Sequence, residues 1–170
     1  MSNTAQVFAT KAHDEKIDTG IRERDTSKLA QYLSNALADS YILYLQTQGV
    51  HWNVVGPAFY GLHKLTETQY EDLAEAIDSI AERIRALGHP APASFSEFEE
   101  NSILTSEPGV ATTEEFLRKL VDGNTSIADR MRKSVAAAEE IDDVYTADLL
   151  TARIGAHEEA AWMYRSLLAQ

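Results

Sequence analysis

Four side chains that can bind metal ions recur at helical spacing between residues 63 and 82. His63 and Glu67 are four residues apart, and Asp78 and Glu82 form a second pair with the same spacing. At about 100° per residue, all four project within about 100° of one another and lie along one flank of a helix. Because the chain has no cysteine, any metal ion must be bound by His, Asp and Glu side chains.

The two pairs are too far apart along one helix to bind the same ion. Between Glu67 and Asp78 a helix rises about 16 Å, whereas metal–ligand bonds are about 2 Å long. If the same helix of a second subunit packs antiparallel about a two-fold axis near Asp72, the first pair of one chain meets the second pair of the other. The sequence therefore predicts two shared metal sites per dimer, with His51 at the end of the preceding helix as a further ligand.

Each of these residues also has an ordinary structural explanation. A single buried histidine is more often a hydrogen-bonded core residue than a ligand. Each carboxylate alone could belong to a solvated helix face, for example with Glu82 paired to Arg85. Only the joint arrangement favours metal. Trp52 and Trp162 are expected to be core or interface aromatics, and the other histidines, His13, His89 and His157, surface or structural residues.

Four long segments carry apolar residues at the spacing of amphipathic helices. Either Thr26 or Ser27 is expected to cap the first helix, and the Gly-Pro pair after Val55 separates it from the second. Thr112 and Glu115 form a capping box for the third. The predicted helices comprise residues 26–54, 58–87 and 113–140, and a fourth that follows residue 146 and continues to the end of the chain.

The connection between the second and third helices is long. Its segment APASFSEFEENSI, residues 91–103, has a serine cap and predicts one or two turns of helix. A single long crossover lets the second and third helices run in the same direction, as in ferritin-like bundles. We therefore predict an all-α fold: a ferritin-like four-helix bundle of residues 26–170 with a short extra helix in this connection. Residues 1–25 lack helical periodicity and are expected to be a mobile N-terminal arm.

The composition excludes several classes of protein. With 170 residues, 44% of them hydrophobic, the chain can bury the core of one domain. A net charge of −12 argues against a general nucleic-acid-binding surface and instead attracts cations. No segment approaches the roughly 18 consecutive apolar residues of a membrane span, and no secretory signal is visible, so a cytoplasmic protein without membrane contact is expected.

Three stretches together resemble the Dps family, the DNA-binding proteins from starved cells or mini-ferritins. They are HWNVVGPAFYGLH followed by Tyr70, then DSIAERIRALG, and finally TADLLTARIGAHEEAAWMYRSLL. The resemblance implies a hollow dodecamer built from two-fold dimers. It also implies ferroxidase activity, in which Fe(II) is oxidised to Fe(III), preferentially with hydrogen peroxide. Storage of the ferric mineral would then protect the cell from oxidative damage.

The resemblance also implies roles for individual residues. His51, His63, Asp78 and Glu82 match the family's iron ligands, whereas Glu67 stands where the family usually has aspartate, in TET rather than FDE. The longer side chain keeps the carboxylate but can alter metal spacing or affinity. Trp52, beside the site, is a candidate to quench stray oxidising equivalents.

An acidic cluster at the junction of the third and fourth helices matches the place of the family's three-fold pores. Asp148, in TADLL, corresponds best to the pore aspartate, and Asp143 is a second candidate. The alternative is that Asp142 and Asp143 cap the fourth helix and compensate its dipole. Both explanations fit the sequence.

DNA binding receives little support from the N-terminal arm. Residues 1–25 carry four basic and five acidic side chains, a sum of about −1, so DNA binding is expected to be weak or absent. An architectural DNA-compacting protein is thus one alternative function that the arm disfavours. A ferritin or rubrerythrin centre inside one bundle is another, but the chain has no Glu-x-x-His motif. A purely structural bundle would show no selective Fe(II) binding.

Overall fold

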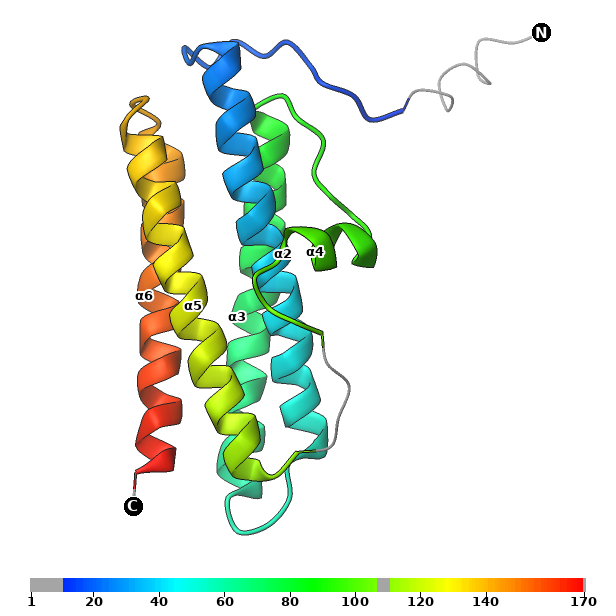
Figure 1. Cartoon of the computed structure of the whole chain (residues 1–170), viewed down its shortest axis with the longest axis vertical. Coiled ribbons are helices and arrows are strands. Elements are labelled where there is room, and N and C mark those ends of the chain that lie inside the picture. Colours follow the sequence, from blue (N-terminus) through cyan, green and yellow to red (C-terminus); the bar gives the residue numbers. More distant parts are fainter. Residues whose placement is uncertain (1–10, 107–110, 170) are drawn as a thin grey trace, which may run out of the picture.

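The computed structural model describes residues 11–106 and 111–169, and these residues form helices and no strands (Figure 1). The predicted all-α bundle with one short extra helix is confirmed. Among the described residues, no helix is long and apolar enough to cross a membrane. The helices are α2 (Glu23–Asn53), α3 (Phe59–Ala86), α4 (Phe95–Asn101), α5 (Thr113–Glu139) and α6 (Val144–Leu168).

The four long helices form two antiparallel hairpins. Helix α2 packs against α3, and α5 packs against α6, whereas α3 and α6 pack against each other far less extensively. The connection after α3 passes along the outer side of α2, where α4 lies crosswise, and α5 begins at the opposite end of the bundle from the end of α3 (Figure 1). Helices α3 and α5 therefore run in the same direction, as the long crossover predicted.

The helix ends follow the sequence signals only in part. Thr112 and Glu115 form the predicted capping box of α5. The predicted cap of α2 at Thr26 or Ser27 is wrong, because the helix already begins at Glu23. The Thr26 hydroxyl lies inside the first turn and donates to the Glu23 carbonyl oxygen at 2.8 Å. Acidic side chains in this turn complement the helix dipole and allow the earlier start.

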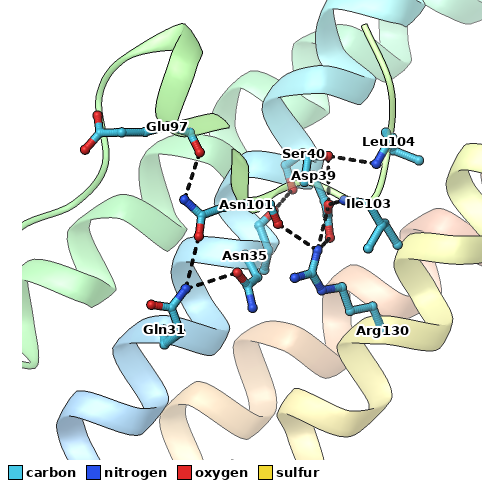
Figure 2. A network of polar contacts seen from close by, with 11 residues as sticks. Gln31, Asn35, Asp39, Ser40, Glu97, Asn101, Ile103, Leu104 and Arg130 are labelled. Atoms are coloured by element: carbon cyan, nitrogen blue, oxygen red, sulfur yellow. Dashed lines mark hydrogen bonds and ion pairs between the residues drawn. The ribbon is translucent and has the colours of Figure 1, made fainter. Parts of the chain in front are cut away.

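An ion pair of a buried carboxylate and a partly buried arginine attaches the crossover to the bundle (Figure 2). The carboxylate of Asp39 on α2 is fully buried and accepts hydrogen bonds from the Ser102 hydroxyl at 2.9 Å and the Ile103 backbone at 2.8 Å. Arg130 on α5 donates to the same carboxylate and to the Asn101 carbonyl oxygen. Burial raises the pKa of Asp39 despite these partners. One carboxylate thus connects α2, α5 and the end of α4.

The described part of the N-terminal arm is attached to the far end of α3. The Glu15 backbone donates to the Gly88 carbonyl oxygen at 2.7 Å, and Arg85 binds the Glu15 carboxylate at 2.5 Å. Gly88 has a φ of +93°, and a Cβ there would meet the Glu15 carbonyl, so glycine is required. Residues 1–10 of the predicted arm lie outside the described residues.

Candidate metal centre

The end of α2 and the first turn of α3 bring two predicted ligands face to face. The rings of His51 and His63 stack with centroids 3.7 Å apart and an interplanar angle of 17°. His51 is buried and His63 is half-buried. The connection between the helices turns at Gly56, whose φ of +92° suits glycine. The turn makes the two histidines neighbours although they are 12 residues apart.

Each ring is held by the backbone of the other residue. Nδ1 of His51 lies 2.8 Å from the His63 carbonyl oxygen, and Nδ1 of His63 lies 3.0 Å from the His51 carbonyl oxygen. A carbonyl oxygen only accepts hydrogen bonds, so each Nδ1 carries the proton and donates it. In the neutral form of each ring the lone pair is then on Nε2, and this is the form in which imidazole binds a metal ion.

Neighbouring side chains restrict the rotation of both rings. Phe59 stacks against His63 with 5.1 Å between centroids. Tyr70 meets His51 edge-on at 5.2 Å. The Thr66 hydroxyl donates to a carbonyl oxygen one turn earlier at 2.7 Å and lies 3.4 Å from Nδ1 of His51. The pair is thus oriented before any metal binds, which favours binding.

Glu67 lies near this pair but is bound to a lysine. Its Oε2 accepts a hydrogen bond from Nζ of Lys64 at 2.5 Å, and both side chains are partly exposed. The hydrogen bond and the charge of Lys64 lower the pKa of Glu67, and they outweigh the opposing effect of desolvation. Glu67 thus forms the kind of ion pair within a helix that the structural alternative expected for a single carboxylate, and it does so beside the two histidines.

The second predicted pair lies further along α3 and is exposed. Among the described residues, neither Asp78 nor Glu82 forms a salt bridge. Arg85, the partner in the structural alternative for Glu82, binds Glu15 instead. Over residues 11–106 and 111–169, no three His, Cys, Asp or Glu side chains come together as one metal site. The chain brings the histidines together, with Glu67 nearby, and keeps the second pair separate.

The two predicted pore residues differ in their surroundings. Asp148 is exposed on α6, whereas Asp143 is buried and caps that helix. Asp143 accepts from the Thr146 backbone at 3.0 Å and from Arg83 at 2.7 Å. Burial alone would raise the pKa of Asp143, but the hydrogen bonds from Thr146 and Arg83 lower it overall. The capping alternative thus describes Asp143, and Asp148 is the better candidate for a pore.

Sequence reasoning missed several features of these sites. The exchange of hydrogen bonds between His51 and His63 depends on the turn between the helices and has no sequence signal. The Lys64–Glu67 pair could have been found from its spacing. Trp52 is 63% exposed and is not a core residue of the subunit. His157, expected at the surface or in a structural role, is fully buried.

Comparison with known proteins identifies the family. The family model described as Ferritin-like domain matches residues 30–170. A DNA protection during starvation protein from Porphyromonas gingivalis is 32% identical over 85% of this chain and 91% of its own length. The chain belongs to the Dps family.

Solved Dps structures share its fold. The Dps protein from Vibrio cholerae, described as a member of the ferritin-like diiron-carboxylate superfamily, has a TM-score of 0.85 and 30% identity over 94% of this chain and 100% of its own. DpsC from Streptomyces coelicolor has a TM-score of 0.90 and 26% identity, with 95% of each chain covered. The resemblance found in the sequence is therefore confirmed, and α3 with both pairs lies inside the matched region.

Proposed function

We propose that this Dps chain stores and detoxifies iron by oxidising Fe(II) with hydrogen peroxide and keeping the ferric mineral in a hollow cytoplasmic dodecamer. The observation that carries the proposal is the His51–His63 pair, with both Nε2 atoms free for a metal ion. The description of the Vibrio cholerae relative as a ferritin-like diiron-carboxylate protein supports iron as that metal. Iron is the substrate here, and the protein provides its ligands.

The proposed ligands suit both oxidation states of iron. Imidazole nitrogen and carboxylate oxygen bind Fe(II), and carboxylates favour the harder Fe(III) product. Two Fe(II) ions each give one electron to hydrogen peroxide, which becomes two hydroxide ions. This two-electron reduction limits release of hydroxyl radicals. Trp52, exposed next to His51, is the candidate to quench stray oxidising equivalents.

We propose that each site is shared between two subunits. One chain would supply His51 and the His63/Glu67 pair, and the other would supply the second pair of α3. The exposure of Asp78 and Glu82, and the engagement of Arg85 elsewhere, leave both carboxylates available to a second chain. The Lys64–Glu67 ion pair must open when a metal ion binds. A site shared between two chains agrees with the absence of a complete metal site in the described part of one chain.

Iron is proposed to reach the interior past Asp148, which is exposed on α6. DNA is not a proposed partner at physiological salt, because residues 1–25 have a net charge of about −1. The names of the relatives refer to starvation and DNA protection, but they describe those proteins and are not evidence that this chain contacts DNA.

Coassembly of two inactive variants tests both the reaction and the shared site. His63→Ala and Glu82→Ala are each assayed for peroxide-driven Fe(II) oxidation, then unfolded together and reassembled. In a mixed dimer, one site carries both lesions and the other carries neither. We expect both parents to be impaired and the mixture to recover activity. Asp122→Ala, which removes an exposed carboxylate from α5, is the matched control and should remain active.

Two results would contradict the proposal. Impaired parents that fail to recover, in verified mixed assemblies, would place the site within one chain. Two fully active parents would show that the α3 flank does not bind the iron that is oxidised.

A further inference from the structure

A cleft between α3 and α6 is separate from the proposed iron ligands. It encloses a cavity of about 250 Å³, and none of the five proposed ligands lines it. Residues of all four long helices line it. The cleft is open because the two hairpins pack less extensively against each other where α3 faces α6. The polar residues that matter here are Thr47, Gln69, Asp72, Asn124, Arg153 and His157.

His157 presents a hydrogen-bond acceptor in this cleft. The Asn124 amide nitrogen donates to the Leu120 carbonyl oxygen at 2.8 Å, which fixes the amide and turns its oxygen toward the ring. That oxygen lies 2.9 Å from Nδ1 of His157, so Nδ1 must donate. Nε2 keeps its lone pair and, among the described residues, has no partner although the side chain is 1% exposed. Burial, reinforced by the Arg153 charge, lowers the pKa of His157 to about 3, so the ring stays neutral.

Two buried hydrogen-bond donors line the same cleft. Arg153 donates through Nη1 and Nη2 to the two Asp72 oxygens at 3.0 Å and 2.7 Å. This leaves the Arg153 Nε without a partner among the described residues, and the same is true of the buried Gln69 amide nitrogen. A buried donor or acceptor without a partner costs roughly 1–3 kcal/mol, so these atoms favour a ligand that can satisfy them.

The charges of the cleft favour a neutral ligand. The Arg153 guanidinium disfavours a metal cation at Nε2 of His157, and the Asp72 and Glu159 carboxylates disfavour an anion. A small molecule that both donates and accepts hydrogen bonds matches one acceptor and two donors. One water molecule occupies roughly 30 Å³ in the liquid, so a molecule with two oxygen atoms fits easily in the cavity of about 250 Å³.

We propose that this cleft binds hydrogen peroxide, with His157 accepting one hydrogen bond from it and Arg153 and Gln69 donating to it. The choice of peroxide among small hydroxylic molecules rests on the proposed function, which consumes it. The binding is reversible and involves no electron transfer. It would hold the oxidant inside the subunit and away from the iron ligands until it is used.

A titration of metal-free protein with hydrogen peroxide, followed by NMR of the histidine rings, tests this site without iron. We expect the His157 ring signals to shift saturably, while those of His13 and His89 do not, and catalase to reverse the shift. Reversal separates binding from oxidation of Met163, which also lines the cleft. Gln69→Leu removes one donor and should weaken the binding roughly threefold to tenfold.

Kinetics with the same variant gives a second readout. In peroxide-driven Fe(II) oxidation, Gln69→Leu should raise the KM for peroxide severalfold and leave anaerobic Fe(II) binding unchanged. A shift that is absent, or equal and unsaturable for every histidine, would show that the cleft holds only water and would overturn the proposal. Saturable binding in a protein that does not oxidise iron would leave the cleft standing and refute the ferroxidase instead.

Discussion

The histidines at two levels of the bundle are fixed in the same way but have different surroundings. At the end of the bundle, His51 and His63 donate through Nδ1 to backbone carbonyl oxygens. At the middle of α6, His157 donates through Nδ1 to the side chain of Asn124. The three rings thus share the tautomer that, when neutral, has its lone pair on Nε2, so tautomer alone does not decide what each ring binds.

The neighbouring charge makes the difference. Glu67 lies beside the first two rings and attracts a cation, whereas beside His157 the charge of Arg153, which opposes a cation, outweighs that of Asp72. Exposure differs as well, because His63 is half-buried and His157 is enclosed by all four helices. The same imidazole form is therefore expected to be a metal ligand in one place and an acceptor for a neutral molecule in the other.

Removing one ring from each place should give the largest contrast. Loss of a hydrogen-bond partner behind a metal ligand typically weakens binding 10- to 100-fold. His63→Ala removes a proposed ligand itself, so it should weaken Fe(II) binding by at least about 100-fold. His157→Gln should leave Fe(II) binding within about twofold. Anaerobic titration calorimetry measures both. A similar loss of Fe(II) affinity in His63→Ala and His157→Gln would show that the two histidine environments do not differ in metal binding.

Acid stability should distinguish His157 from an exposed histidine. Its pKa is about 3 in the folded chain against an ordinary value of 6.5. Between these values the unfolded chain binds a proton that the folded chain does not, so the free energy of unfolding falls as the pH falls. The contribution is about 1.4 kcal/mol per pH unit below 6.5. Urea unfolding of His157→Gln from pH 7 to 4.5 should therefore show a shallower loss than the parent chain.

His13→Gln serves as the control for this measurement, because His13 is exposed. It should keep the pH dependence of the parent. If the free energy of unfolding of His157→Gln also falls with pH as steeply as that of the parent chain, His157 is not a buried ring that stays neutral in the folded chain.

Much of the fold could be predicted because apolar periodicity and capping residues are local signals. The spacing of apolar residues located α3 within one residue at each end, and Thr112 with Glu115 marked the start of α5. The start of α2 was misplaced, because Thr26 is an equally good residue for a cap and for a first turn whose hydroxyl bonds back to the helix. The Asp39–Arg130 ion pair joins residues 91 positions apart, which no local pattern reveals.

The candidate site could be predicted only to the level of residue type and helix flank. The i, i+4 pairs on α3 follow from helical geometry, and so does the separation that splits them. The orientation of the His51 and His63 rings depends on the turn at Gly56 and on carbonyl oxygens, whose positions only the folded chain defines. For the same reason His157 was expected to be surface or structural, since its burial arises from packing between hairpins.

The smallest predicted effect concerns the charge that distinguishes the two places. Lys64 binds the Glu67 carboxylate at 2.5 Å and therefore competes with any metal ion for it. Lys64→Met should strengthen Fe(II) binding only about twofold to threefold, since exposed ion pairs of this kind are weak. Lys119→Met, which removes an exposed lysine from α5, is the matched control and should change nothing. Weaker Fe(II) binding in Lys64→Met would mean that Lys64 orients Glu67 for the metal ion. Cation binding at this end of the bundle would then depend on the Lys64–Glu67 ion pair.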